Sequence, residues 1–192
     1  MFVVEVVILA VVATNGNPST PVLPGGGIIA WIICNGRKRN PIGGWLLFYY
    51  WQLWSGLFVS AVFFAINIQS YVPENFDSGR LFGIFLASTV PVLLLLLVQL
   101  VVATVILSFR TPDMLRLLRW TLVAQVVAVA VGAAIDAKYY PDNIAFSVLA
   151  LIQETLWMFY FFKSTRVRHV FESQDWEIAV HSIYPLNPKL ST

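Results

Sequence analysis

The most demanding residue in this chain is a single carboxylic acid, Glu154, which stands inside the apolar stretch LIQETLWMFYFF. It lies nine residues before Lys163, or ~13 Å along a helix, which is near the middle of a ~30 Å hydrocarbon core. An ionised carboxylate at that depth costs at least ~2.5 kcal/mol. Every lysine and arginine lies at the end of an apolar stretch or between two of them, so the sequence offers Glu154 no cation at its own depth.

Three hypotheses for Glu154 are open. The carboxyl can be protonated, because burial disfavours the charged form, and can bond Gln99, Gln125 or Gln153, the other polar side chains expected inside the membrane. It can instead face a water-filled path and exchange protons. Its counterpart can also come from another subunit or a ligand. These hypotheses predict a structural role, proton handling and an interaction site respectively.

No pattern in the sequence predicts a catalytic or cofactor site. The only histidines, His169 and His181, follow the last apolar stretch, whereas membrane haem and metal sites need ligands within the spans. A lone cysteine, Cys34, cannot form an intrachain disulfide. Hydrolase, metalloprotease and phosphate-binding motifs are absent from the sequence. We therefore expect no enzyme activity, no cofactor and no metal.

The composition indicates what kind of elements position Glu154. Of 192 residues, 58% are hydrophobic and 11% are charged, against ~25% charged in a soluble domain. Four stretches have the ~20 apolar residues that a membrane-crossing helix needs. They are about 42–68, 81–108, 119–136 and 144–162. The sequence thus predicts an all-α integral membrane protein with a four-helix transmembrane bundle at 36–171.

Residues 1–35 carry two shorter apolar pieces, Phe2–Ala13 and 28–34, joined by a turn rich in Asn, Gly and Pro. Phe2–Ala13 has the length of a signal-peptide core, but it contains Glu5 and lacks a leading positive charge. The pieces can form two short spans, or a shallow hairpin that does not fully cross. We prefer two short helices packed on the main bundle.

The basic residues predict an orientation. Two of the 12, Arg80 and Lys138, lie in the connections 69–80 and 137–143, which leaves ten on the other side. Short loops rich in Lys and Arg stay in the cytoplasm, so we expect both ends of the bundle there. Lys163, Arg166 and Arg168 would then meet lipid headgroups and could bind their phosphates. The net charge of +2 is too small to indicate nucleic-acid binding.

Two stretches resemble the bacterial membrane family known as domain of unknown function 2569. The stretch IGGWLLF (42–48) is similar to its opening Gly-Gly-Trp-Leu signature, and LWMFYFFKSTRVRHVF (156–171) to its closing pattern. His169 departs from that pattern, which has a small polar residue there. The resemblance covers about 41–171 and implies a four-helix protein of the bacterial inner membrane, but it implies no activity and no functional residues.

The tail, 172–192, contains one helical stripe of apolar residues. Its members are Trp176, Val180, Ile183 and Tyr184. Acidic neighbours such as Glu172, Asp175 and Glu177 would repel anionic headgroups. We therefore expect the stripe to dock on protein, either the bundle's own cytoplasmic loops or a partner subunit, with a disordered tail as the alternative.

Taken together, these patterns favour a small multi-pass protein whose surroundings are the lipid bilayer and other membrane-protein subunits. The leading hypothesis is a structural, accessory or assembly subunit of a larger membrane complex. The runner-up is a proton-coupled small-molecule transporter that uses Glu154 with Gln99 and Gln125. An enzyme that acts on lipid or quinone ranks third.

Overall fold

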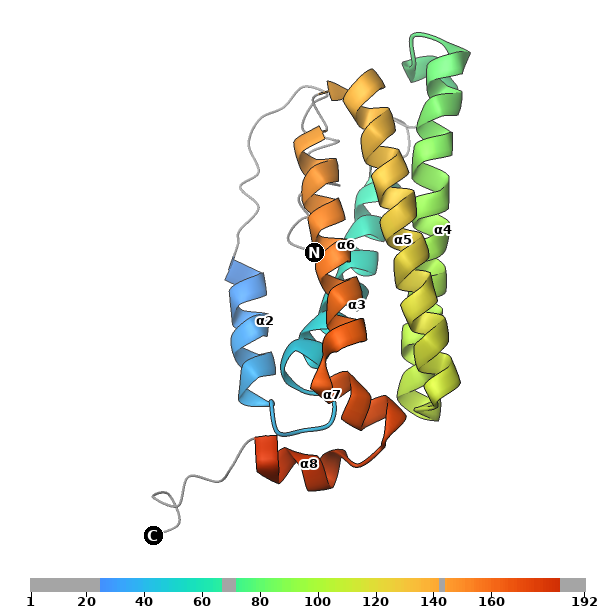
Figure 1. The fold of residues 1–192 in the computed structure, drawn as a ribbon. Helices are drawn as coiled ribbons and strands as arrows, with labels where there is room; N and C mark the ends of the chain where they lie inside the picture. The colour runs from blue at the N-terminus through green and yellow to red at the C-terminus, as the bar shows by residue number, and fades with distance from the viewer. Residues whose placement is uncertain (1–24, 67–71, 142–143, 184–192) are drawn as a thin grey trace.

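The computed structural model describes residues 25–66, 72–141 and 144–183, of which 87% are helical and none forms a strand. Four long helices run side by side (Figure 1): α3 (Gly44–Ile66), α4 (Gly79–Phe109), α5 (Pro112–Tyr139) and α6 (Ile144–Lys163). The helix α2 (Gly25–Gly36) packs against α3. The shorter elements are η2 (Pro73–Asn75), α7 (Thr165–Val167), the π-helical turn η4 (Arg168–Glu172) and α8 (Trp176–Ile183).

Three helices in the described part of the chain, α4, α5 and α6, are long and apolar enough to cross a membrane. Only 22% to 33% of their most apolar stretches is buried in the bundle, so most of that apolar surface faces outward, as it does toward lipid. The helix α3 has 23 residues but is not one of the three.

Of the two N-terminal apolar pieces, the second forms α2. The first, Phe2–Ala13, lies outside the described residues, so the choice between two spans and a hairpin stays open.

The third apolar stretch, expected at 119–136, corresponds to a longer helix, α5. Its start is set by Thr111, whose hydroxyl accepts a hydrogen bond from the Met114 N–H, and by Pro112 at the first helical position. Only Arg110 and Thr111 separate α4 from α5. The helix therefore begins ahead of the apolar stretch, and Arg116 and Arg119 lie within its first turns. The bounds of α3, α4 and α6 lie within two residues of the predicted stretches.

The main core lies at one end of the bundle, which we call the basic end. The connection 37–43, the short connection 110–111 and the segment 164–175 all lie there (Figure 1). Aromatic side chains join α3 to α6: the Tyr49 ring lies 5.1 Å from Trp157 and 4.7 Å from Phe161, both edge-on. Such pairs contribute about 0.5–1.5 kcal/mol each beyond the area that they bury. They fix the rotation of α6 against α3, and with it the position of Glu154.

Candidate functional site

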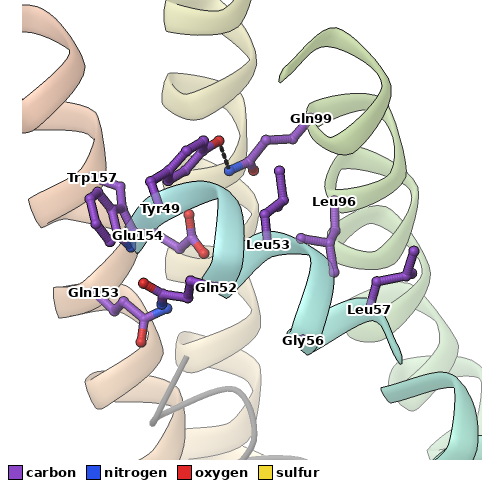
Figure 2. Close-up of a pocket in the computed structure, with 10 residues that line it drawn as sticks. All are labelled: Tyr49, Gln52, Leu53, Gly56, Leu57, Leu96, Gln99, Gln153, Glu154 and Trp157. Atoms are coloured by element: carbon purple, nitrogen blue, oxygen red, sulfur yellow. Dashed lines mark hydrogen bonds between the residues drawn. The ribbon is translucent and has the colours of Figure 1, made fainter. Parts of the chain in front are cut away.

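A small cleft lies between α3, α4 and α6, and Glu154 contributes to its wall from the middle of α6 (Figure 2). The other polar or aromatic residues that line it are Tyr49, Gln52, Gln99, Gln153 and Trp157. Leu53, Gly56, Leu57 and Leu96 complete the wall with apolar surface. The cleft has a volume of about 30 Å³, which is room for one or two water-sized groups.

Glu154 is the only acidic residue in this wall, and it is only 6% exposed. Within the described residues its Oε2 atom has no hydrogen-bond partner, and no lysine or arginine lines the cleft. Figure 2 shows its carboxyl end pointing from α6 toward α3, between Tyr49 and Gln52. An unpaired carboxylate is strongly disfavoured in such a place. The carboxyl therefore needs a proton or a partner from outside the described chain.

The glutamines that the sequence pointed to have different partners. Gln99 donates through Nε2 to the Tyr49 hydroxyl oxygen over 2.9 Å. Gln125 donates to the Val92 carbonyl oxygen over 3.4 Å and does not line the cleft. The printed bond of each of these two amides thus goes to an acceptor other than Glu154. Gln153 does line the cleft, next to Glu154.

Tyr49 and Gln52 also line the cleft, and neither is among the site residues predicted from the sequence. With Gly56, they follow the spacing i, i+3, i+7, which places all three on one face of α3. Gln52 carried a usable signal in the sequence, because it is an amide inside an apolar stretch. In the structure it is only 6% exposed. Tyr49 had none, since a tyrosine at that depth is as typical of an interface as of a core.

A second polar site holds the basic end together, and Arg166 is its centre. The guanidinium donates through Nη1 to the carbonyl oxygens of Gly43 and Asn40, over 2.5 and 3.3 Å, and through Nη2 to that of Lys38. Its central carbon lies 4.5 Å from the centre of the Trp176 ring. Arg166 is only 8% exposed. This arrangement fastens the connection 37–43 to the end of α6, and we call it the Arg166 clamp.

The Arg166 clamp removes Arg166 from the residues predicted to bind lipid headgroups. Arg166 was one of them, but its guanidinium is occupied by backbone carbonyls and by Trp176. Lys163 and Arg168 are exposed at the basic end and keep the predicted role. Arg119 is also engaged: it donates to the Phe161 carbonyl oxygen over 2.9 Å and pairs with Glu172 at 2.6 Å.

Two glycines allow the clamp to close. Gly44 has φ of +56°, a conformation that other residues rarely adopt, and a Cβ there would lie 3.6 Å from the Arg166 guanidinium. A Cβ on Gly43 would lie 1.8 Å from the Arg37 carbonyl oxygen. The stretches 42–48 and 156–171, which carry the family resemblance, thus contact each other through Arg166 and these glycines.

The helix α8, the described part of the tail beyond η4, lies against the basic end (Figure 1). Trp176 is buried and donates from Nε1 to the Arg39 carbonyl oxygen over 3.0 Å, while Ala179 and Val180 also face inward. Ile183, expected on this face, is 38% exposed, and Tyr184 lies outside the described residues. The residues of α8 that face the basic end are therefore Trp176, Ala179 and Val180. The buried Trp176 fixes the rotation of α8 about its own axis.

We predict that hydrogen exchange across 172–183 is slow in the intact protein and becomes fast in Trp176→Ala. The reason is that this change removes the ring on Arg166 and the bond to Arg39. Ile178→Ala is the matched control on the same helix, because Ile178 is 80% exposed and should leave protection unchanged. Equal exchange in the two variants would contradict docking through Trp176.

Comparison of the chain with protein-family models, with curated proteins and with solved structures finds no match. The resemblance to domain of unknown function 2569 stays a prediction, and no residue role is taken from it.

Proposed function

We propose that this chain is a four-span protein of the bacterial inner membrane that serves as a structural, accessory or assembly subunit of a larger membrane complex. In this proposal α3 crosses the bilayer beside α4, α5 and α6, and the C-terminus lies in the cytoplasm. A partner subunit lies against the helices that form the Glu154 cleft. The Arg166 clamp keeps the basic end rigid, so that the cleft is presented in one geometry.

One observation carries the proposal: the buried Oε2 of Glu154 has no hydrogen-bond partner in the described chain, although it lines a cleft. Buried polar groups are almost always paired, and ionisable residues inside membranes pair with one another or mark a functional site. A neighbouring protein can supply the missing group. The outward apolar surface of α4, α5 and α6 is compatible with such packing.

Purification in a mild detergent tests the proposal. We expect a second membrane protein to be retained in constant stoichiometry by the wild type and lost from Glu154→Leu. Gln125→Leu removes a buried amide outside the cleft and is the control, which should retain the partner. A strictly single-component preparation from native membranes, by gentle extraction and native mass spectrometry, would contradict the proposal.

The alternative function, proton-coupled transport of a small molecule, is favoured by the gathering of Gln52, Gln99 and Gln153 around Glu154. Liposomes that contain this protein alone separate the two functions. Proton flux that Glu154→Gln abolishes would support transport, whereas an accessory subunit gives no flux above that of empty liposomes.

We predict that Glu154→Gln leaves folding and membrane insertion of the isolated chain unchanged, within ~0.5 kcal/mol. The amide keeps the size and hydrogen bonding of a neutral carboxyl, and the described cleft holds no cation that requires a charge. Thermal unfolding in detergent measures this. A large loss of stability in Glu154→Gln, with Glu154→Asp tolerated, would show instead that the isolated chain needs the charge.

The proposed orientation predicts which side of the membrane two serines face. Ser78 lies before α4 at the end opposite the basic end, and Ser173 lies between η4 and α8. In a Cys34→Ala background, Ser173→Cys should react with an impermeant thiol reagent only from the cytoplasm, and Ser78→Cys only from the periplasm. Labelling of Ser173→Cys from the periplasm would invert the topology.

A further inference from the structure

Two buried acceptor atoms in the wall of the cleft have no partner among the described residues. Gln99 uses its amide nitrogen on the Tyr49 hydroxyl, which leaves its Oε1 as the remaining group, and that oxygen has no partner. The Oε2 of Glu154 is the second buried acceptor without a partner among the described residues of this wall. Gln99 is 2% exposed and Glu154 6%. A group that complements them must donate hydrogen bonds and, facing a carboxylate, carry positive charge.

The narrow cleft favours a compact cation. A volume of about 30 Å³ admits a compact ammonium head. The planar guanidinium of arginine is larger, and it needs room for a fork of five N–H donors. Three ammonium protons match separate acceptors, and the rings of Tyr49 and Trp157 in the same wall add surfaces that attract cations.

The rest of the wall suits the stem of a lysine. Leu53, Leu57 and Leu96 form apolar surface beside the polar residues, and lysine side chains bury their methylene groups along such surface while the charged head finds polar atoms. Glu154 stands alone as the charged residue of the wall, and Tyr49, Gln52 and Gln99 face it from α3 and α4.

We propose that the cleft binds a primary ammonium group, which a lysine side chain on a membrane helix of the partner subunit supplies in the assembled complex. The source of the group rests on the proposed function, whereas the binding of an ammonium group by the cleft does not. When the group enters, the carboxyl proton of Glu154 passes to water and the two charges pair. An unpaired charge inside the membrane is costly for either helix, and pairing the carboxylate with the ammonium group lowers the cost of both charges.

Methylammonium chloride added to the purified protein in detergent is the direct test. We expect a saturable rise in the thermal midpoint, roughly 5 °C at a hundredfold excess over Kd. Tetramethylammonium chloride, at the same ionic strength, has no N–H group to donate to the two acceptors and should give no rise. Glu154→Gln should abolish the methylammonium effect, and Gln125→Met, a change outside the cleft, should keep it.

The outcomes separate this inference from the proposed function. An equal rise with sodium or potassium chloride, or an unchanged response in Glu154→Gln, would overturn the ammonium site. No response to methylammonium in the wild type would overturn it as well. Each of these results leaves the partner subunit to be decided by co-purification, which does not depend on the chemistry of the bound group.

Discussion

Arg166→Ala is expected to lower the free energy of unfolding by at least ~3 kcal/mol, since hydrogen bonds to charged groups contribute about 1.5–3 kcal/mol each. The change strands the carbonyl oxygens of Lys38, Asn40 and Gly43, all of which accept from the guanidinium. It also removes the cation beneath Trp176, so α8 should loosen. Titration with a denaturing detergent, followed by tryptophan fluorescence, measures the loss.

Two further variants show whether geometry or charge matters at this position. Arg166→Lys keeps the charge but cannot reach three carbonyls with one compact head, so it should lose most of the same stability. Arg168→Ala changes an exposed arginine two residues away and should stay within ~0.5 kcal/mol of the wild type. Similar stabilities for Arg166→Ala and Arg168→Ala would show that the clamp contributes little.

Gly43→Ala is expected to destabilise the protein even more, by ~4 kcal/mol or above, which is exceptional for a single methyl group. The new Cβ would lie 1.8 Å from the Arg37 carbonyl oxygen and 2.8 Å from its carbon. Both are backbone atoms, so no side chain can rotate away. The connection 37–43 must open, and the acceptors of Arg166 move with it.

Gly36→Ala is the matched control for this prediction. Gly36 lies at the end of α2, and a Cβ there meets nothing within 4 Å, so the variant should remain within ~0.5 kcal/mol of the wild type. Yield of folded protein and the unfolding midpoint, measured for both variants side by side, decide the matter. A Gly43→Ala protein as stable as Gly36→Ala would contradict the close approach at this loop.

The sequence predicted the long helices well, because apolar length and composition determine them locally. It failed at the start of α5, where Thr111 and Pro112 override the basic residues that follow. The Arg166 clamp could not be predicted, because it joins residues 123 positions apart, Gly43 and Arg166. Headgroup binding was the natural interpretation of an arginine after an apolar stretch, and only the packing of the connection 37–43 reveals its carbonyl partners.

The candidate site was predicted in part. The lack of a cation near Glu154 followed from the positions of the basic residues, and it holds for the described wall of the cleft. Which amide faces Glu154 depends on how each helix is rotated, and aromatic contacts such as Tyr49–Trp157 set that rotation. Gln125 therefore donates to the Val92 carbonyl oxygen, and Gln52, which was not among the predicted site residues, lines the cleft.

Photocrosslinking inside the native membrane tests most directly whether a partner subunit covers the Glu154 cleft. A benzophenone amino acid replaces Leu57, which lines the cleft, or Val127 on α5, which does not. The two positions lie 13 and 15 residues from the basic-end starts of their helices, ~20 and ~22 Å along the helix axis. We expect one discrete membrane-protein adduct from Leu57, lost when Glu154→Leu is added, and none of that mass from Val127. Lipid adducts alone from Leu57, or the same protein adduct from both positions, would contradict a partner at the cleft.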